Sequence, residues 1–555
     1  MERKIKYLLL FTGFAMLVVF FIFENLDGDI KGYGYWQFPL IKRHLASQWA
    51  MPYLTPGKCG GFLLAADTQS LIFTPYMLMS FLVPNLEWAV KITNFLLSIL
   101  LWAGTYRWLE YFGIVNRTAR IFAGLLFTAC GYWVYHMTMI GQVWAAGLAY
   151  TPWIMVGMEN ILRGPLRLDR KYMLSALTLA GLFFLLINSG YYWLQVAVPL
   201  IGFRVLAECI WPQSQKLQQL KKLGIIAGIA LYAVLLSWPR LGAINEFQLS
   251  KFPREKGVVN HYQVIGNVKV LLDKLWHSFF DGDIVANQVT EPQILGAMWD
   301  YNNFIGFMAV IPFILGLRKI KDLLPLKIFT GLLLAVIFQL ALMRTTHVAD
   351  LIRSLIPLYK SITWYWRGTP ILCLMVIVFV ARGYERILGH KKWGLFLAVI
   401  LMALNLSEIM WANHRYFKLP DPPVSAIMVN SMDLPKPLKM HYTCCIDYIF
   451  GYGNSYPPQL SINAGEDFWH YSRNPAYYNM HDVRAMFDPK TPKGYYMEHP
   501  WPLWPKADKK EFDEFINFKQ IVKPSAWLQF INKISLTAAG AYFICLFVLL
   551  FFCFS

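Results

Sequence analysis

Charged residues are scarce in this sequence. They make up 15% of its 555 residues, whereas 57% are hydrophobic, and a soluble domain carries about 25% charged residues. This deficit argues against a soluble globular protein and predicts an all-α polytopic membrane protein. The formal net charge of +18 does not predict nucleic-acid binding, because no basic, aromatic-bearing soluble domain is present to bind it.

Metal-binding, disulfide and cleavage motifs are also lacking. The 8 Cys form no C-x-x-C pattern and no His/Cys spacing typical of zinc, so no disulfide framework is expected. The first segment, MERKIKYLLLFTGFAMLVVFFIF, contains no A-x-A site, which predicts an uncleaved signal-anchor helix over 1–23. No internal repeat is visible, which counts against an inverted-repeat transporter.

Long apolar runs are abundant and predict about 12 transmembrane helices. After the anchor, we expect spans at 88–109, 118–136, 142–161, 172–189, 191–210, 221–238, 302–317, 325–343, 369–387, 393–412 and 534–554. They divide the chain into the following parts: the anchor 1–23, a first loop 24–87, helices in 88–238, a loop 239–301, helices in 302–412, a segment 413–533 and a last helix in 534–555.

The basic residues fall in alternate short loops, as Arg163, Lys222 and Lys391 illustrate. This positive-inside pattern places both termini in the cytoplasm and the three long segments on the opposite side. We expect 413–533 to form a small irregular cap. The run LIFTPYMLMSFLV at 71–83 is too short to span and contains Pro75, so it predicts a re-entrant or interfacial helix.

Two carboxylates, Asp27 and Asp29, lie just beyond the predicted end of the first span. A carboxylate near the lipid boundary is partly desolvated, which suits it to take a proton from an acceptor hydroxyl. The alternative is structural, a helix cap or a salt bridge to Lys31. The aromatic, glycine-rich loop that follows favours a functional role for at least one of these two carboxylates.

Four arginines lie near span ends on the predicted outside: Arg240, Arg254, Arg344 and Arg367. Arginine binds phosphate oxygens bidentately and stabilises charge on a departing phosphate. These residues are therefore candidates for holding the phosphate of a lipid-linked donor. The alternative for each is snorkelling at the bilayer boundary.

Other polar residues at the predicted outer boundary are candidates for substrate binding: His136, Gln142, Tyr191, Tyr192 and Trp364. Helix capping, turn chemistry and interfacial anchoring are the structural alternatives. The Asp281-Gly282-Asp283 triplet is a weak candidate for a divalent-cation site. The sequence predicts no certain cofactor, and it leaves open the binding of a divalent cation.

Several motifs resemble one family. GDIKGYGYWQFPL, followed by MPYLTPGKCGGFLLAADTQSLIFTP, resembles the first periplasmic loop of YfhO-like bacterial membrane proteins. The resemblance continues in HMTMIGQVWAAGLAYTPWI, SWPRLGAINEFQLSKFPRE and SITWYWRGTP, and does not extend to 413–533. The turn from Met51 to Pro56 lacks the Trp and Asn of the usual family motif.

This resemblance implies a GT-C-like fold, that of multi-span transferases which take a sugar from a polyprenyl-phosphate carrier. It implies Asp29 as the catalytic base, with Asp27 as the second choice. The chain would act in the bacterial inner membrane, in contact with membrane lipids. The acceptor could be a glycan, a lipid or a protein.

Two other functions stay open. A lipid-linked sugar transporter or flippase would carry ionisable residues within its spans, and here the middles of the spans contain few charges. A non-catalytic membrane assembly subunit would share the topology and need none of the carboxylates.

Overall fold

The structure is a computed structural model. It describes residues 2–23, 41–42, 45, 72–138, 143–166, 169–190, 193–211, 216–246, 267–280, 302–318, 326–344, 346–355, 365–390, 393–417, 440–443, 460–463 and 524–551.

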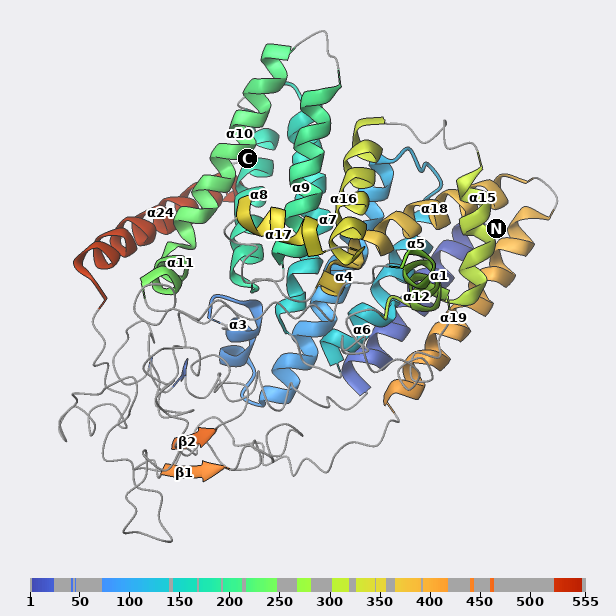
Figure 1. The fold of residues 1–555 in the computed structure, drawn as a ribbon, viewed down its shortest axis with the longest axis horizontal. Coiled ribbons are helices and arrows are strands. Elements are labelled where there is room, and N and C mark those ends of the chain that lie inside the picture. Colours follow the sequence, from blue (N-terminus) through green and yellow to red (C-terminus); the bar gives the residue numbers. More distant parts are fainter. Residues whose placement is uncertain are drawn as a thin grey trace.

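The described part of the chain is dominated by helices (Figure 1). The helices that coincide with predicted spans are α1 (Glu2–Val18) with η1 (Val19–Phe23), α4 (Leu86–Tyr111), α5 (Arg117–Ala129), α6 (Gly131–Thr138), η3 (Val143–Ala146), α7 (Gly147–Arg163), α8 (Arg170–Asn188), α9 (Trp193–Ile210), α10 (Lys216–Leu236), η6 (Phe307–Ala309), α15 (Val310–Leu317), α16 (Leu326–Arg344), α18 (Pro370–Gly389), α19 (Gly394–Phe417) and α24 (Ala526–Phe551).

Every predicted span contains one of these helices, and 6 described helices are long and apolar enough to cross a membrane. The prediction of a helical membrane protein is therefore confirmed. The total of about 12 crossings and the orientation of the termini remain predictions.

Shorter elements lie between the spans. They are α3 (Pro75–Leu82), α11 (Trp238–Ala243), α12 (Val268–Phe280), α17 (Thr346–Leu355), η9 (Tyr365–Gly368) and the strands β1 (Met440–Thr443) and β2 (Leu460–Asn463). Helix α3 lies within the run predicted as a re-entrant or interfacial helix. Pro75 is its first residue, a position that needs no N–H donor. Within the predicted cap segment, β1 and β2 pair in parallel.

Local sequence signals set several helix starts. The side chains of Asn85, Asn116 and Asp169 accept hydrogen bonds from backbone N–H groups in the first turns of α4, α5 and α8. These are the residue types favoured at helix N-caps. Pro370 begins α18, again where a missing N–H costs nothing.

Polar contacts join the helices at both ends of the bundle. We call the end of the bundle where α1 begins the inner end, and the end where α1 finishes the outer end. At the inner end, Arg163, the last residue of α7, donates to the carbonyl of Tyr111 in α4, and Glu385 of α18 accepts from the backbone N–H of Asn116. At the outer end, Asn188 of α8 bonds Ser237 after α10.

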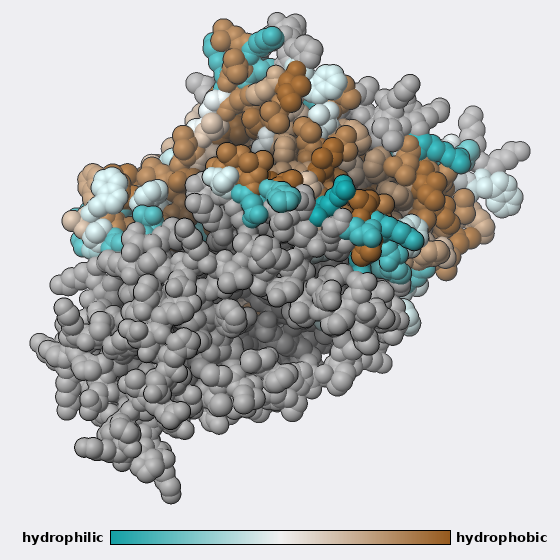
Figure 2. Space-filling view, in the orientation of Figure 1, coloured by the Kyte–Doolittle hydropathy of each residue, from teal (hydrophilic) through white to brown (hydrophobic). Residues whose placement is uncertain are grey.

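The tightest helix pair is α15 with α18. A side chain on Gly316 would overlap the backbone of Phe379, and one on Gly383 would overlap the backbone of Pro312. Small residues allow membrane helices to approach this closely. Elsewhere many large apolar side chains are exposed, including Phe11, Leu231 and Phe543. Figure 2 shows apolar residues over much of the described helical surface, as lipid contact requires.

Two predicted spans are broken rather than continuous. The span 118–136 divides into α5 and α6 at Cys130. The span 302–317 begins with a segment that is not helical, 302–306, and becomes α-helical only at Val310. The expectation of one unbroken helix in each is therefore wrong.

Neighbouring elements satisfy the backbone groups freed by these breaks. The N–H of Gly131 donates to the carbonyl of Phe304 at 3.1 Å, so the two breaks are bonded to each other. Asn413 donates to the carbonyl of Ala129 at 3.1 Å. Such pairing is what non-helical backbone needs within a membrane.

Candidate functional site

Arg367 lies in a buried turn at the outer end of the bundle, on η9 just before α18. Arg367 is only 8% exposed. The hydroxyl of Tyr132 donates to the Arg367 carbonyl at 3.1 Å. Gln339 packs directly against Gly368, where a Cβ would overlap its amide. The turn is therefore fixed from α6 and from α16 together.

The non-helical segment 302–306 supports the same turn. Asn303 donates to the hydroxyls of Thr369 at 2.9 Å and Ser278 at 3.2 Å. Its own N–H bonds the carbonyl of Ser278 at 3.1 Å. The start of α18, the end of α12 and the break at 302–306 thus meet at Asn303, which is 0% exposed.

His136 lies one turn after Tyr132 on α6 and is also 0% exposed. Its Nδ1 is 2.8 Å from the Tyr132 carbonyl, and the two rings stack with centroids 4.1 Å apart. Because a carbonyl can only accept, Nδ1 carries the proton and Nε2 is the acceptor of the neutral ring. Tyr132 thus connects two residues predicted for the site, His136 and Arg367.

Arg240 is the second buried outer arginine, 1% exposed on α11. Its Nη1 donates to the carbonyl of Asn188. The Asn188 side chain in turn donates to Ser237 at 3.0 Å and to the Phe184 carbonyl at 2.8 Å. Arg240 is therefore held between the outer ends of α8 and α10.

Arg344 differs from these two arginines, because it is exposed at the end of α16. Snorkelling accounts for such a position. The remaining predicted site residues lie outside the described residues: Asp27, Asp29, Gln142, Tyr191, Tyr192, Arg254, Asp281, Asp283 and Trp364. Among the described residues, no group of three or more His, Cys, Asp or Glu could hold a metal ion.

Three residues of this region were missed in the sequence. Tyr132 precedes the predicted His136 by one helical turn, a spacing that places both on one face. Asn302 and Asn303 form a polar pair at the start of an apolar run. The spacing of Tyr132 and His136 and the Asn302-Asn303 pair are both visible in the sequence. Neither pattern predicts which helices these residues contact.

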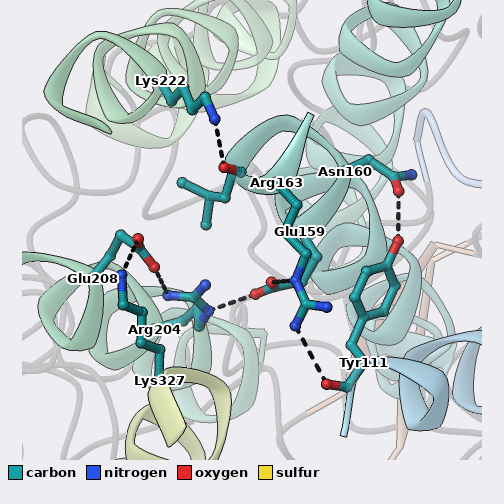
Figure 3. Close-up of polar contacts among 9 residues, drawn as sticks. Tyr111, Glu159, Asn160, Arg163, Arg204, Glu208, Lys222 and Lys327 are labelled. Atoms are coloured by element: carbon teal, nitrogen blue, oxygen red, sulfur yellow. Dashed lines mark hydrogen bonds and ion pairs between the residues drawn. The ribbon is translucent and has the colours of Figure 1, made fainter. Parts of the chain in front are cut away.

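A buried charge network lies at the inner end of the bundle. Arg204 of α9 donates from Nε to Glu159 of α7 at 2.5 Å and from Nη1 to Glu208 at 2.7 Å (Figure 3). Glu159, Arg204 and Glu208 are at most 5% exposed. All three lie within predicted spans, toward their inner ends.

Basic side chains surround this core of three residues. Arg163 contacts Glu159 at 3.2 Å, and Lys327 of α16 contacts Glu208 at 2.9 Å. Lys222 of α10 donates to the Leu162 carbonyl at 2.8 Å, as Figure 3 shows. The network therefore joins α7, α9, α10 and α16 at one end of the bundle.

The comparisons with known proteins give one similar structure. No family model matches the sequence, and no curated protein matches it. The crystal structure of the Archaeoglobus fulgidus oligosaccharyltransferase, in complex with zinc and sulfate, aligns with a TM-score of 0.43 and 11% sequence identity. The alignment covers 82% of this chain and 62% of that chain, so this chain spans less than two thirds of that protein's length.

Proposed function

We propose that this chain is a membrane glycosyltransferase of the GT-C type. It moves a sugar from a polyprenyl-phosphate-linked donor to a glycan, lipid or protein acceptor at the outer face of a bacterial inner membrane. Asp29, or Asp27 in its place, is the base. Arg367 and Arg240 hold the donor phosphate.

The observation that carries this proposal is the burial of Arg240 and Arg367. A snorkelling arginine extends its guanidinium toward water, whereas these residues are 1% and 8% exposed at the outer end of an apolar bundle. Placing a guanidinium there is costly. Nη1 of Arg240 donates to the Asn188 carbonyl, and a guanidinium fixed in this way is preorganised to stabilise a phosphate leaving group.

The sequence motifs of the first loop supply the other half of the proposal. They resemble a family in which an acidic residue of this loop is the base, and Asp29 follows Gly28 in the matching position. A base must come within about 2.6–3.2 Å of the acceptor hydroxyl, directly or through one water.

The decisive experiment is transfer from a radiolabelled polyprenyl-phosphate-sugar in membranes containing the full chain. Asp29→Asn keeps the shape of the side chain and removes its basicity, so we expect transfer to fall by roughly 10²–10⁴. Donor binding should persist. Normal transfer by the Asp27→Asn/Asp29→Asn double variant would remove this loop from the chemistry.

A second candidate, a lipid-linked sugar transporter, is favoured by the two broken spans. Broken helices that contact each other near the middle of a bundle form substrate sites in transporters, and here Gly131 bonds Phe304 across the breaks. Donor translocation without any transferred sugar, in proteoliposomes that contain only this chain, would select the transporter.

A further inference from the structure

The carboxylates of the described membrane helices fall into two groups. Most form ion pairs: Glu87 with Lys91, Glu110 with Arg120, Glu159 and Glu208 with Arg204, and Glu385 with Arg382. Glu408 of α19 is different, because it is in no ion pair with any of the described residues. It lies in the part of α19 that is apolar enough to cross a membrane, Gly394–Asn413.

Glu408 faces the break at the start of the span 302–317. Its Oε2 accepts the N–H of Met308 at 3.0 Å. In a continuous helix this N–H would bond the carbonyl of Phe304, which instead accepts from Gly131. The carboxylate thus replaces one missing helical bond and keeps a second oxygen, Oε1.

Asn405 lies one turn before Glu408 on the same face of α19. It is 0% exposed, and neither its Oδ1 nor its Nδ2 has a hydrogen-bond partner. Both side chains border Gly306, whose φ of +94° suits glycine. A Cβ there would overlap the Asn405 amide and lie 3.1 Å from Glu408 Oε2.

The buried Asn405 amide lacks hydrogen-bond partners, and the Glu408 carboxylate lacks a counter-charge among the described residues. A buried amide without a partner costs about 1–3 kcal/mol. A carboxylate within a membrane span without a counter-charge is costly as well, and such residues mark ion or proton sites. A single occupant that supplies one positive charge and accepts oxygen ligands would remove both costs.

We propose that the break at Gly306, with Glu408 and Asn405, binds a monovalent alkali cation. One carboxylate matches one positive charge, and carboxylate and amide oxygens suit a hard cation. The remaining ligands would come from backbone carbonyls released by the break and from water. Glu408 itself is partly exposed.

The test uses the purified full chain in detergent, with Na⁺ as the probe. We expect the apparent melting temperature to rise saturably with NaCl relative to equal concentrations of choline chloride, because a ligand that binds only the folded state stabilises it. Glu408→Gln should abolish this rise. Asn405→Ala should weaken the apparent Na⁺ affinity at least about tenfold. Glu385→Gln, at a paired carboxylate, should leave the response intact.

Direct binding of ²²Na⁺ to the unmodified chain keeps the proposal testable if a variant fails to fold. Saturable binding displaced by unlabelled Na⁺ or K⁺, but not by choline, supports the site. Equal stabilisation by NaCl and choline chloride, with no saturable ²²Na⁺ binding, overturns it. A melting temperature that responds to pH and not to Na⁺ also overturns it, because a proton would then neutralise Glu408.

Discussion

The two ends of the helix bundle handle buried charge differently. At the inner end, Arg204 is matched by Glu159 and Glu208, and basic side chains complete the network. At the outer end, Arg240 donates from Nη1 to the Asn188 carbonyl, and the backbone carbonyl of Arg367 accepts from the Tyr132 hydroxyl.

This difference indicates different roles for the two ends. Charges that satisfy one another fasten helices and need no ligand, although their net stabilisation is small because desolvation offsets attraction. Buried guanidinium groups at the outer end of the bundle are instead suited to an anionic substrate. The inner network is therefore structural, and the outer arginines are the better candidates for function.

The largest expected effect comes from breaking the inner network at its centre. Arg204→Met removes the shared cation from two buried carboxylates, so we expect the free energy of unfolding to fall by about 3–5 kcal/mol. Denaturant unfolding in mixed micelles measures this. The matched control is Arg107→Met, whose partner Glu110 is 3.5 Å away with both side chains more than half exposed; it should cost at most about 1 kcal/mol. Equal losses in the two variants would contradict a structural inner network.

Neutralising an outer arginine should affect transfer more than stability. If Arg367 binds the donor phosphate as proposed, Arg367→Gln removes a charged hydrogen bond worth about 1.5–3 kcal/mol, so transfer should fall by roughly 10- to 100-fold. The measurement is kcat and KM for a polyprenyl-phosphate-sugar. Arg344→Gln, at an exposed position, is the control and should transfer normally. If both variants transfer normally, the outer arginines have no role in the chemistry.

A smaller effect is expected from the hydroxyl that holds the Arg367 turn. Tyr132→Phe loses one buried hydrogen bond and should cost about 0.5–1.5 kcal/mol of unfolding free energy. Tyr150→Phe is the matched control, because the Tyr150 hydroxyl is buried without a partner and its removal should be neutral or stabilising. The comparison fails if Tyr150→Phe proves the more destabilising change.

The smallest effect is expected at the edge of the inner network. Lys327 is 28% exposed and shares Glu208 with Arg204, so Lys327→Met should lower the unfolding free energy by less than about 1 kcal/mol. The same unfolding assay applies. A loss as large as that of Arg204→Met would show that Lys327, and not Arg204, is the main counter-charge of Glu208.

The sequence predicted the helices well because hydrocarbon imposes a simple rule. A run of about 20 apolar residues must satisfy its backbone internally, and a helix does so. The run ending in Arg344 is helical as expected, as is the run between Gly394 and Asn413. The orientation that the alternation of basic loops predicts remains a prediction.

The same rule could not predict the breaks. The apolar runs 118–136 and 302–317 each predict a continuous helix. Their interruptions at Cys130 and Gly306 depend on hydrogen bonds from distant segments. Phe304, Gly131 and Asn413 supply those bonds, and they are far apart in the chain.

Sequence alone thus determined the membrane class, the approximate spans and the arginines worth examining, since composition and periodicity are local properties. Only the tertiary structure decided which charges are matched. Glu159 meets Arg204 at a distance of 2.5 Å, while Glu408 meets the backbone of a broken span. Both are single glutamates in apolar runs of the sequence. Their difference comes from the helices packed against them, which local pattern does not specify.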